Sequence, residues 1–397
     1  MMDEFKQRLA DIETLAARLE ARKQDLQRAA AEDAGFAVKI TGIEVDLGVQ
    51  HLRTMREEIP WVEDRKPYGT VAAIFPYDAG AVMLARLGGS ALITGNRLRF
   101  SFTSQTPRTA GILAEVCEPI GSLEPVLGQD NRTFGLQCVE DDEVRVLFMS
   151  GASAVGEAYR TQHEAFDKLF FAGPGGMPAA VVFEDGDPTA SARFIGRRAF
   201  INGGQYCTTI KKALIHRKRF ASVRDAVLSQ VRSLVVGDPL DPETDIGPVR
   251  VKRTRLIVQN ALDRCAGARL LMGGIEGEWI RPIVMETEAG SDIPDLELFG
   301  PLLILKPFDD PEQVVGELTR TRYGFLLAFF GDPPAEARNQ FAAHFGMVHD
   351  NPDFFFSPLR IHFGGRKESG WIIERNASGW ETRDGAFLYS RELVRPL

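Results

Sequence analysis

Cys207 is the residue of this sequence best placed by its neighbours to act as a nucleophile. It lies in the segment GGQYCTTIKK, after a glycine turn and shortly before Lys211 and Lys212. A thiol becomes nucleophilic when backbone N–H dipoles or positive charges favour its thiolate form. Free cysteines are, however, also common as small buried residues. The segment alone leaves both interpretations open.

The remaining cysteines and the histidines indicate no metal site. Cys117, Cys138 and Cys265 lie in helix-like or strand-like segments, and four cysteines in 397 residues are too sparse for a disulfide framework or a zinc site. We therefore predict a reducing, cytoplasmic compartment. The spacing of the six histidines fits no metal site; they are His51, His163, His216, His344, His349 and His362.

Alternating short apolar runs and helix-length segments predict parallel sheets. Apolar runs at Thr70–Phe75 and Leu98–Phe102 flank a helix-length segment, which is a βαβ pattern. EVRVLFMSGASAVGEAYR repeats the order strand, turn and helix, and it would place N–H groups where a phosphate could bind. Further strands are predicted at Ala179–Phe183, KKALIHR, GPLLILKPF and GAFLYSREL. The periodic leucines of the first fifty residues predict helices on a domain surface.

Charge and hydropathy exclude two classes of partner. The net charge is -8 and the pI is near 5.5, which argues against a general nucleic-acid binder. No apolar run approaches the length of about 18 residues that a membrane span needs. We expect a small-molecule substrate, with no nucleic acid and no membrane as partner.

Four motifs in order resemble the aldehyde dehydrogenase superfamily from about residue 60 onward. FINGGQYC resembles its Asn-x-Gly-Gln-x-Cys motif, and LVVGDPLDPETDIGPV the segment that follows it. ELFGP (297–301) is similar to Glu-x-Phe-Gly-Pro, and IHFGGRKESG to the late Pro-Phe-Gly-Gly-x-Lys-x-Ser-Gly.

The resemblance implies an α/β fold with two domains, both with largely parallel sheets. A Rossmann-type cofactor domain would cover residues 1–173 and an α/β catalytic domain residues 174–370. Residues 371–397 would form a C-terminal tail that could supply an oligomerisation strand. In the family a cysteine attacks an aldehyde, hydride passes to NAD or NADP, and a Glu activates the water that releases the thioester.

Carried over residue by residue, the resemblance makes Cys207 the nucleophile, with its own N–H as an oxyanion donor. Asp78 stands where the family has the second donor, an Asn. An ionised carboxylate would repel the oxyanion, so Asp78 could donate only if burial kept it protonated; a helix N-cap is the alternative role. The resemblance also places Glu297 among the catalytic residues, and it places Glu297 and Phe299 in the cofactor site.

Other positions depart from the family pattern. Ala172 takes the place of the general base, which puts hydrolytic release of the thioester in doubt. Ser101 stands near the ribose lysine's position, and Gly151 with Ala152 at the pyrophosphate position. The resemblance thus implies NAD or NADP at a partly eroded site.

The substrate pocket and the oligomer are also predicted. Tyr77 and an aromatic wall of Phe354, Phe355 and Phe356 would line the pocket, a mild indication of an apolar substrate. Family members carry a β-hairpin arm where this chain has only the short link PWVEDRK. We therefore expect a homodimer and not an arm-exchanged tetramer.

Three functions stay open at this point. The first is a Cys207-dependent, NAD(P)-linked oxidoreductase of an aldehyde or acyl thioester, which we favour. The second is a nicotinamide-independent acyl-thioester or acyl-transfer enzyme that uses Cys207. The third is a catalytically silent homologue with a binding role.

Overall fold

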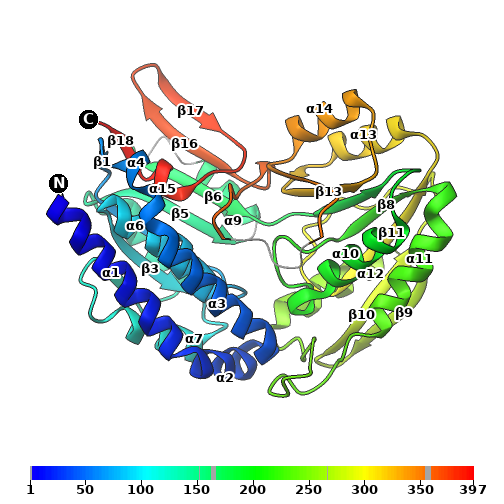
Figure 1. Cartoon of the computed structure of the whole chain (residues 1–397), viewed down its shortest axis with the longest axis horizontal. Helices are drawn as coiled ribbons and strands as arrows, with labels where there is room; N and C mark the ends of the chain where they lie inside the picture. The colour runs from blue at the N-terminus through cyan, green and yellow to red at the C-terminus, as the bar shows by residue number, and fades with distance from the viewer. Residues whose placement is uncertain (1, 152, 162–166, 266, 354–358) are drawn as a thin grey trace.

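Two seven-stranded sheets, side by side, form the framework of the chain (Figure 1). The computed structural model describes residues 2–151, 153–161, 167–265, 267–353 and 359–397. Each sheet is largely parallel and covered by helices, which confirms the predicted α/β class with two domains. No helix among the described residues combines the length and apolarity needed to cross a bilayer.

The first sheet has the order β17-β16-β6-β5-β2-β3-β4. The five strands from β6 to β4 are parallel, and β16 and β17, which come late in the sequence, extend the other edge antiparallel. The strands are β2 (Thr70–Phe75), β3 (Arg97–Phe102), β4 (Leu123–Val126), β5 (Val144–Gly151), β6 (Leu169–Pro174), β16 (Trp371–Asn376) and β17 (Gly379–Arg383). The strand β2 has the predicted bounds.

Helices from the N-terminus pack onto this sheet, and their apolar faces are part of its core. They are α1 (Met2–Ala21), α2 (Lys23–Ala34) and α3 (Val38–Thr54), followed by η1 (Met55–Glu58) and α4 (Ile59–Val62). The other helices of this domain are α5 (Gly80–Met83), η2 (Leu84–Gly88), α6 (Gly89–Thr94), α7 (Pro107–Cys117), α8 (Asn131–Glu140) and α9 (Ser153–Arg160).

The second sheet has the order β14-β13-β7-β8-β11-β10-β9, and only β9 runs antiparallel to its neighbour. Its strands are β7 (Ala179–Val182), β8 (Lys212–His216), β9 (Arg269–Glu276), β10 (Trp279–Glu286), β11 (Leu302–Phe308), β13 (Leu326–Phe330) and β14 (Met347–Asp350). Its helices are α10 (Pro188–Phe200), η4 (Ile201–Gly204), α11 (Arg217–Arg232), α12 (Lys252–Arg264), α13 (Pro311–Arg320) and α14 (Ala335–His344). A two-stranded ribbon of β12 (Tyr323–Gly324) and β15 (Arg366–Lys367) precedes the return to the first sheet.

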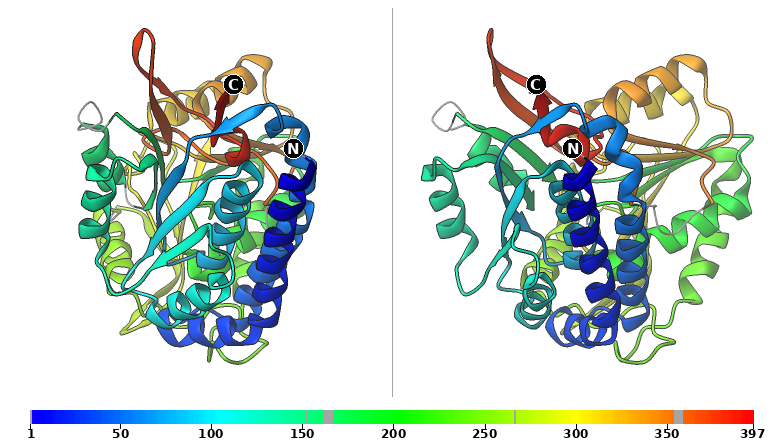
Figure 2. Two further views of the ribbon diagram at one scale, coloured as in Figure 1. Left: turned by 90° about the vertical axis from the view of Figure 1, so that its left-hand side faces the viewer. Right: turned by 60° about the vertical axis from the view of Figure 1, so that its left-hand side comes forward.

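The C-terminal segment returns to the first domain. Its hairpin β16–β17 projects from the body of the chain (Figures 1 and 2). The predicted strand GAFLYSREL is wrong: this stretch makes one bridge, Phe363 to Phe387, and then the short helix α15 (Tyr389–Glu392). The last strand is β18 (Val394–Pro396), which pairs with β1 (Arg65–Pro67), so two segments distant in sequence meet there. The apolar side chain of Leu393, just before β18, is buried.

Candidate active site

The turn that carries Cys207 is fixed against a second loop by backbone contact. Directly after α10, Asn202 and Gly203 within η4 adopt positive φ angles of 53° and 60°, and the chain turns there. Gly204 has φ 69°, and a Cβ there would lie 2.2 Å from the carbonyl oxygen of Gly300. The N–H of Gly300 donates to the carbonyl of Gly204 at 2.9 Å. Only glycine allows this approach, which joins the cysteine turn to the loop 297–301.

Lys211 holds the same two segments together and does not serve Cys207 as a nearby charge. Its Nζ donates to the carbonyls of Gly204 at 2.6 Å and Gly300 at 2.7 Å, and its side chain is fully buried. Lys212 points elsewhere, with Nζ 3.6 Å from a carboxylate oxygen of Glu317. The expectation that these lysines favour the thiolate is therefore wrong.

The thiol of Cys207 is half-buried and neutral at pH 7. Burial raises its pKa to about 12, and the nearby carboxylate of Asp78 also raises it. The guanidinium groups of Arg86 and Arg198 lower the pKa by a smaller amount. A neutral thiol is a poor nucleophile, so the site needs a group that removes the proton.

Asp78 follows β2 and is buried, with 6% of its surface exposed, and its charge acts on Cys207. Burial raises the pKa of its carboxyl to about 7. Its alternative role as a helix N-cap is not observed, because α5 begins after Ala79 without a side-chain cap. Asp78 can therefore exist in either protonation state near neutral pH.

A second buried carboxyl, Glu44 of α3, lies close to this group. The hydroxyl of Tyr206, next to Cys207, donates to the Glu44 carboxylate. Burial raises the pKa of Glu44 to about 8, and the charge of Asp78 adds to this shift. No motif or spacing pointed to Glu44, because only the packing of α3 brings it to the site.

Glu297, Phe299 and Tyr77 lie on segments that contact the turn of Cys207 or the start of α9. The carboxylate oxygens of Glu297 accept the N–H of Ser153, at the start of α9, at 3.1 and 3.2 Å. The rings of Tyr77 and Phe299 meet edge to face with centroids 5.9 Å apart. The Tyr77 hydroxyl donates to Gln205 at 3.1 Å, so Tyr77 supports the cysteine turn as well as lining a cavity with Asp78.

The other predicted site residues occupy the first sheet or fall outside the described residues. Ser101 is fully buried on β3 and donates to Asn131 at 2.8 Å. Gly151 ends β5 beside open space, and Ala172 is buried on β6 opposite Trp371. Ala152, Phe354, Phe355 and Phe356 lie outside the described residues.

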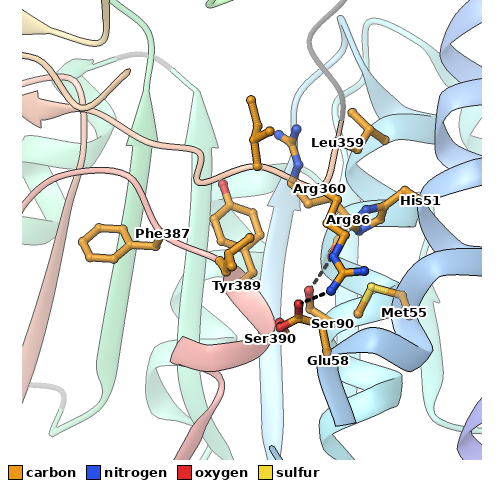
Figure 3. Close-up of a pocket in the computed structure, with 12 residues that line it drawn as sticks. His51, Met55, Glu58, Arg86, Ser90, Leu359, Arg360, Phe387, Tyr389 and Ser390 are labelled. Atoms are coloured by element: carbon orange, nitrogen blue, oxygen red, sulfur yellow. Dashed lines mark hydrogen bonds and ion pairs between the residues drawn. The ribbon is translucent and has the colours of Figure 1, made fainter. Parts of the chain in front are cut away.

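Arg86 is a further buried cation of the site. It lies on η2, a π-helical turn between α5 and α6, and is 6% exposed. Its guanidinium carbon lies 3.9 Å from the centroid of the Phe363 ring, and its buried Nε has no hydrogen-bond partner. Figure 3 shows it with Tyr389 in the wall of a cavity between the first helices and the C-terminal segment. An arginine within the apolar stretch AGAVMLARLGG was the signal that could have found it.

Glu58 lines the same cavity but does not pair with Arg86, because other residues already donate hydrogen bonds to its carboxylate. Its carboxylate accepts from Arg360 at 2.9 Å and from Ser390 at 2.8 Å (Figure 3). It also accepts from Arg391 at 3.2 Å. These contacts lower its pKa against the effect of burial. No carboxylate of the described residues forms an ion pair with Arg86.

The family model and the relatives described below all belong to one family. The model of the aldehyde dehydrogenase family matches residues 3–383. Phenylacetaldehyde dehydrogenase of Pseudomonas fluorescens is 30% identical over 364 residues, covering 88% of this chain and 71% of that protein. A probable NADP-dependent succinate-semialdehyde dehydrogenase of Sinorhizobium fredii is 29% identical over 331 residues, covering 80% and 67%. Aldehyde dehydrogenase C of Pseudomonas syringae, solved with NAD+ and octanal, superposes with a TM-score of 0.87 at 22% identity and shares the fold over 99% of this chain and 84% of that one.

Proposed function

The chain belongs to the aldehyde dehydrogenase family, and we propose that it oxidises an aldehyde with NAD or NADP through a covalent intermediate on Cys207. The observation that carries this proposal is the position of Cys207. It lies on a glycine turn fixed against the loop of Glu297, within reach of the charges of Asp78 and two buried arginines. Its backbone N–H supplies one donor for the oxyanion of a thiohemiacetal.

The residues at the start of α9 fit a dinucleotide phosphate. The N–H of Ser153 already binds two carboxylate oxygens of Glu297, so this helix end accepts anionic oxygen. No atom lies within 4 Å of the place a Cβ would take at Gly151, which leaves room for a phosphate near the backbone. A nicotinamide bound here would supply the hydride acceptor. A phosphate at this helix end would displace the Glu297 carboxylate from the Ser153 N–H. That carboxylate could then accept a hydrogen bond from the nicotinamide ribose.

We expect Glu297→Gln to bind NAD or NADP about fivefold more tightly, measured by calorimetry. The substitution removes a negative charge that competes with phosphate at a helix N-terminus, an effect of about 1 kcal/mol, and it keeps a side chain that can hydrogen-bond the ribose. The control is Glu288→Gln, which removes the same charge from an exposed position. Weaker binding by Glu297→Gln would contradict competition at this position.

Arg86 supports a substrate that carries its own negative charge. A buried guanidinium without a carboxylate partner is costly, and a substrate anion would pair with it. Its charge acts on Cys207, so the anionic group would stand close to the reacting aldehyde. The relative from Sinorhizobium fredii is named for such a substrate, a semialdehyde of a dicarboxylic acid. We therefore propose short anionic aldehydes as the substrate class.

The assay that tests this function follows the formation of reduced nicotinamide from NAD or NADP with a semialdehyde and with a neutral aldehyde of equal chain length. We expect turnover of both and a lower KM for the semialdehyde. Arg86→Met should raise the KM of the semialdehyde roughly tenfold or more, because a charge-assisted hydrogen bond is lost, and should change that of the neutral aldehyde little. Arg86→Lys should restore part of the difference. The absence of any binding of NAD and NADP at millimolar concentration would refute the proposed function.

Release of the product stays a separate proposal. Ala172 is buried between β5 and β16 and offers no carboxylate at the position of the family's base. Transfer of the acyl group to a thiol therefore remains an alternative to hydrolysis.

We also propose a homodimer, in which the edge strand β17 is the surface that could pair. We propose the cytoplasm as the compartment, since all four cysteines are free.

A further inference from the structure

Tyr206, the residue directly before Cys207, links the cysteine turn to α3 of the first domain. Its hydroxyl donates a hydrogen bond to the carboxyl group of Glu44, a residue that is 7% exposed. We propose that Tyr206 and Glu44 are positioning residues, which through this bond hold Cys207 in the orientation that attacks the substrate carbonyl. The proposal rests on the proposed function, because it takes Cys207 as the nucleophile.

The ring of Tyr206 is held by the same part of α3 as its hydroxyl. It packs against a small buried cluster of Ala37, Ile40 and Ile201. Ala37 is the N-cap of α3, and Ile40 stands four residues before Glu44, so these two side chains lie on one face of the helix. Apolar contact therefore seats the ring where its hydroxyl meets the carboxyl group.

The helix that receives Tyr206 is itself anchored to the second domain where it begins (Figure 1). The N–H of Val38 donates to the carbonyl of Pro239 at 2.9 Å, and the Nζ of Lys39 donates to the carboxylate of Asp245 at 2.6 Å. The start of α3 is thus a fixed support at the boundary of the two domains. Tyr206 contacts it within the next two turns of the helix.

The backbone around Cys207 is also fixed on both sides. The hydroxyl of Tyr77, from the first domain, donates to the side-chain oxygen of Gln205 at 3.1 Å. The carbonyl of Tyr206 accepts the N–H of buried Thr209 at 3.1 Å and its hydroxyl at 2.8 Å. The two residues before Cys207 are therefore held by the first domain, and the residues after it by the turn itself.

Glu44 acts in this pair as a neutral acceptor. Burial raises its pKa to about 8, and the charge of Asp78 adds to this shift. Burial also raises the pKa of Tyr206, so the pair carries little net charge at pH 7 and contributes through its hydrogen bond. Glutamine, which has the shape of a protonated glutamate side chain, can then replace Glu44 as the acceptor.

Tyr206→Phe tests the proposal, because it removes only the hydroxyl and keeps the ring on α3. We expect the rate of nicotinamide reduction in the first turnover to fall roughly tenfold or more, since a misplaced nucleophile attacks slowly. The KM of the cofactor should change little. Glu44→Gln keeps an acceptor and should keep most of this rate, whereas Glu44→Leu should lower it as Tyr206→Phe does.

The control is Thr41→Val, which removes another buried hydroxyl of α3. Among the described residues this hydroxyl has no hydrogen-bond partner, so its removal should leave the first-turnover rate unchanged. A wild-type rate in Tyr206→Phe, or an equal loss of rate in Thr41→Val, would overturn the proposal.

A double variant separates positioning from stability. Tyr206→Phe deprives the buried carboxyl group of Glu44 of its donor, so the midpoint of urea unfolding should fall. Adding Glu44→Leu removes that carboxyl group and should raise the midpoint again, but the first-turnover rate should stay low because the link is still absent. Recovery of the rate together with the midpoint would overturn the positioning role.

A last measurement needs neither aldehyde nor cofactor. The rate at which iodoacetamide alkylates Cys207, followed by mass spectrometry, should rise roughly threefold or more in Tyr206→Phe, because a turn released from α3 opens more often. Glu44→Gln should keep the wild-type rate. An unchanged rate in Tyr206→Phe would overturn the positioning role even in a chain that oxidises aldehydes. A raised rate in a chain that oxidises no aldehyde would support the link and refute the proposed function alone.

Discussion

Cys207→Ala is expected to lower kcat/KM for aldehyde oxidation by at least about 1,000-fold, because the covalent route disappears with the nucleophile. The thiol is half-buried and its loss removes few contacts, so the thermal midpoint should change little. Mass spectrometry after incubation with an aldehyde and NAD or NADP should detect an acyl adduct on the wild type and none on the variant.

The matched control is Cys265→Ala, which removes a buried thiol from α12's end in the same domain. It should retain activity and adduct formation while losing some stability. An adduct that persists in Cys207→Ala would show that another nucleophile carries the chemistry.

Lys211→Met is expected to reduce both stability and turnover. The buried Nζ of Lys211 donates to the carbonyls of Gly204 and Gly300, and methionine would remove both hydrogen bonds. The carbonyl of Gly204 would keep the N–H of Gly300 as a donor, and that of Gly300 the N–H of Leu302. The loss of these two buried hydrogen bonds should cost about 2 kcal/mol of the free energy of unfolding. Because the same contacts fix the cysteine turn against the loop of Glu297, kcat should fall as well.

Urea unfolding followed by circular dichroism measures the change in stability. Lys218→Met is the control, since Lys218 pairs with Glu184 at an exposed position where ion pairs contribute little. A variant of Lys211 as stable as Lys218→Met would show that its two hydrogen bonds contribute little, and would contradict the role given to this lysine.

The sequence predicted those parts of the fold whose signals are local. The strand Thr70–Phe75 has the predicted bounds because an uninterrupted apolar run enters the centre of a parallel sheet. The stretch GAFLYSREL begins with apolar residues but makes only a single bridge, at Phe387, and α15 forms after it. Tertiary pairing, which composition does not encode, decided between the two.

The residues of the site also differ in whether a local sequence signal could predict them. The motif around Cys207 could be recognised in the sequence, and so could Asp78 and Glu297 as its expected partners. Glu44 and Arg198 could not, because they enter from α3 and α10, which only the packed chain brings together. Arg86 had a local signal, its place in an apolar stretch, but nothing in the sequence linked it to Cys207. Lys211 was adjacent in sequence and was assigned a charge effect, whereas its actual contacts are backbone carbonyls. The burial that shifts the pKa of Asp78 is likewise a property of the fold.

Strands from late in the sequence complete the first sheet, and this sets the order in which the domains can finish folding during synthesis. The edge of β6 receives β16 only after all the strands of the second sheet, from Ala179 to Asp350, have left the ribosome. Until then β6 is an open edge that other chains could join. The second domain can close earlier, while the first waits for a pairing between Ala172 and Trp371, far apart along the chain. The slower domain to mature is thus the one that begins the sequence.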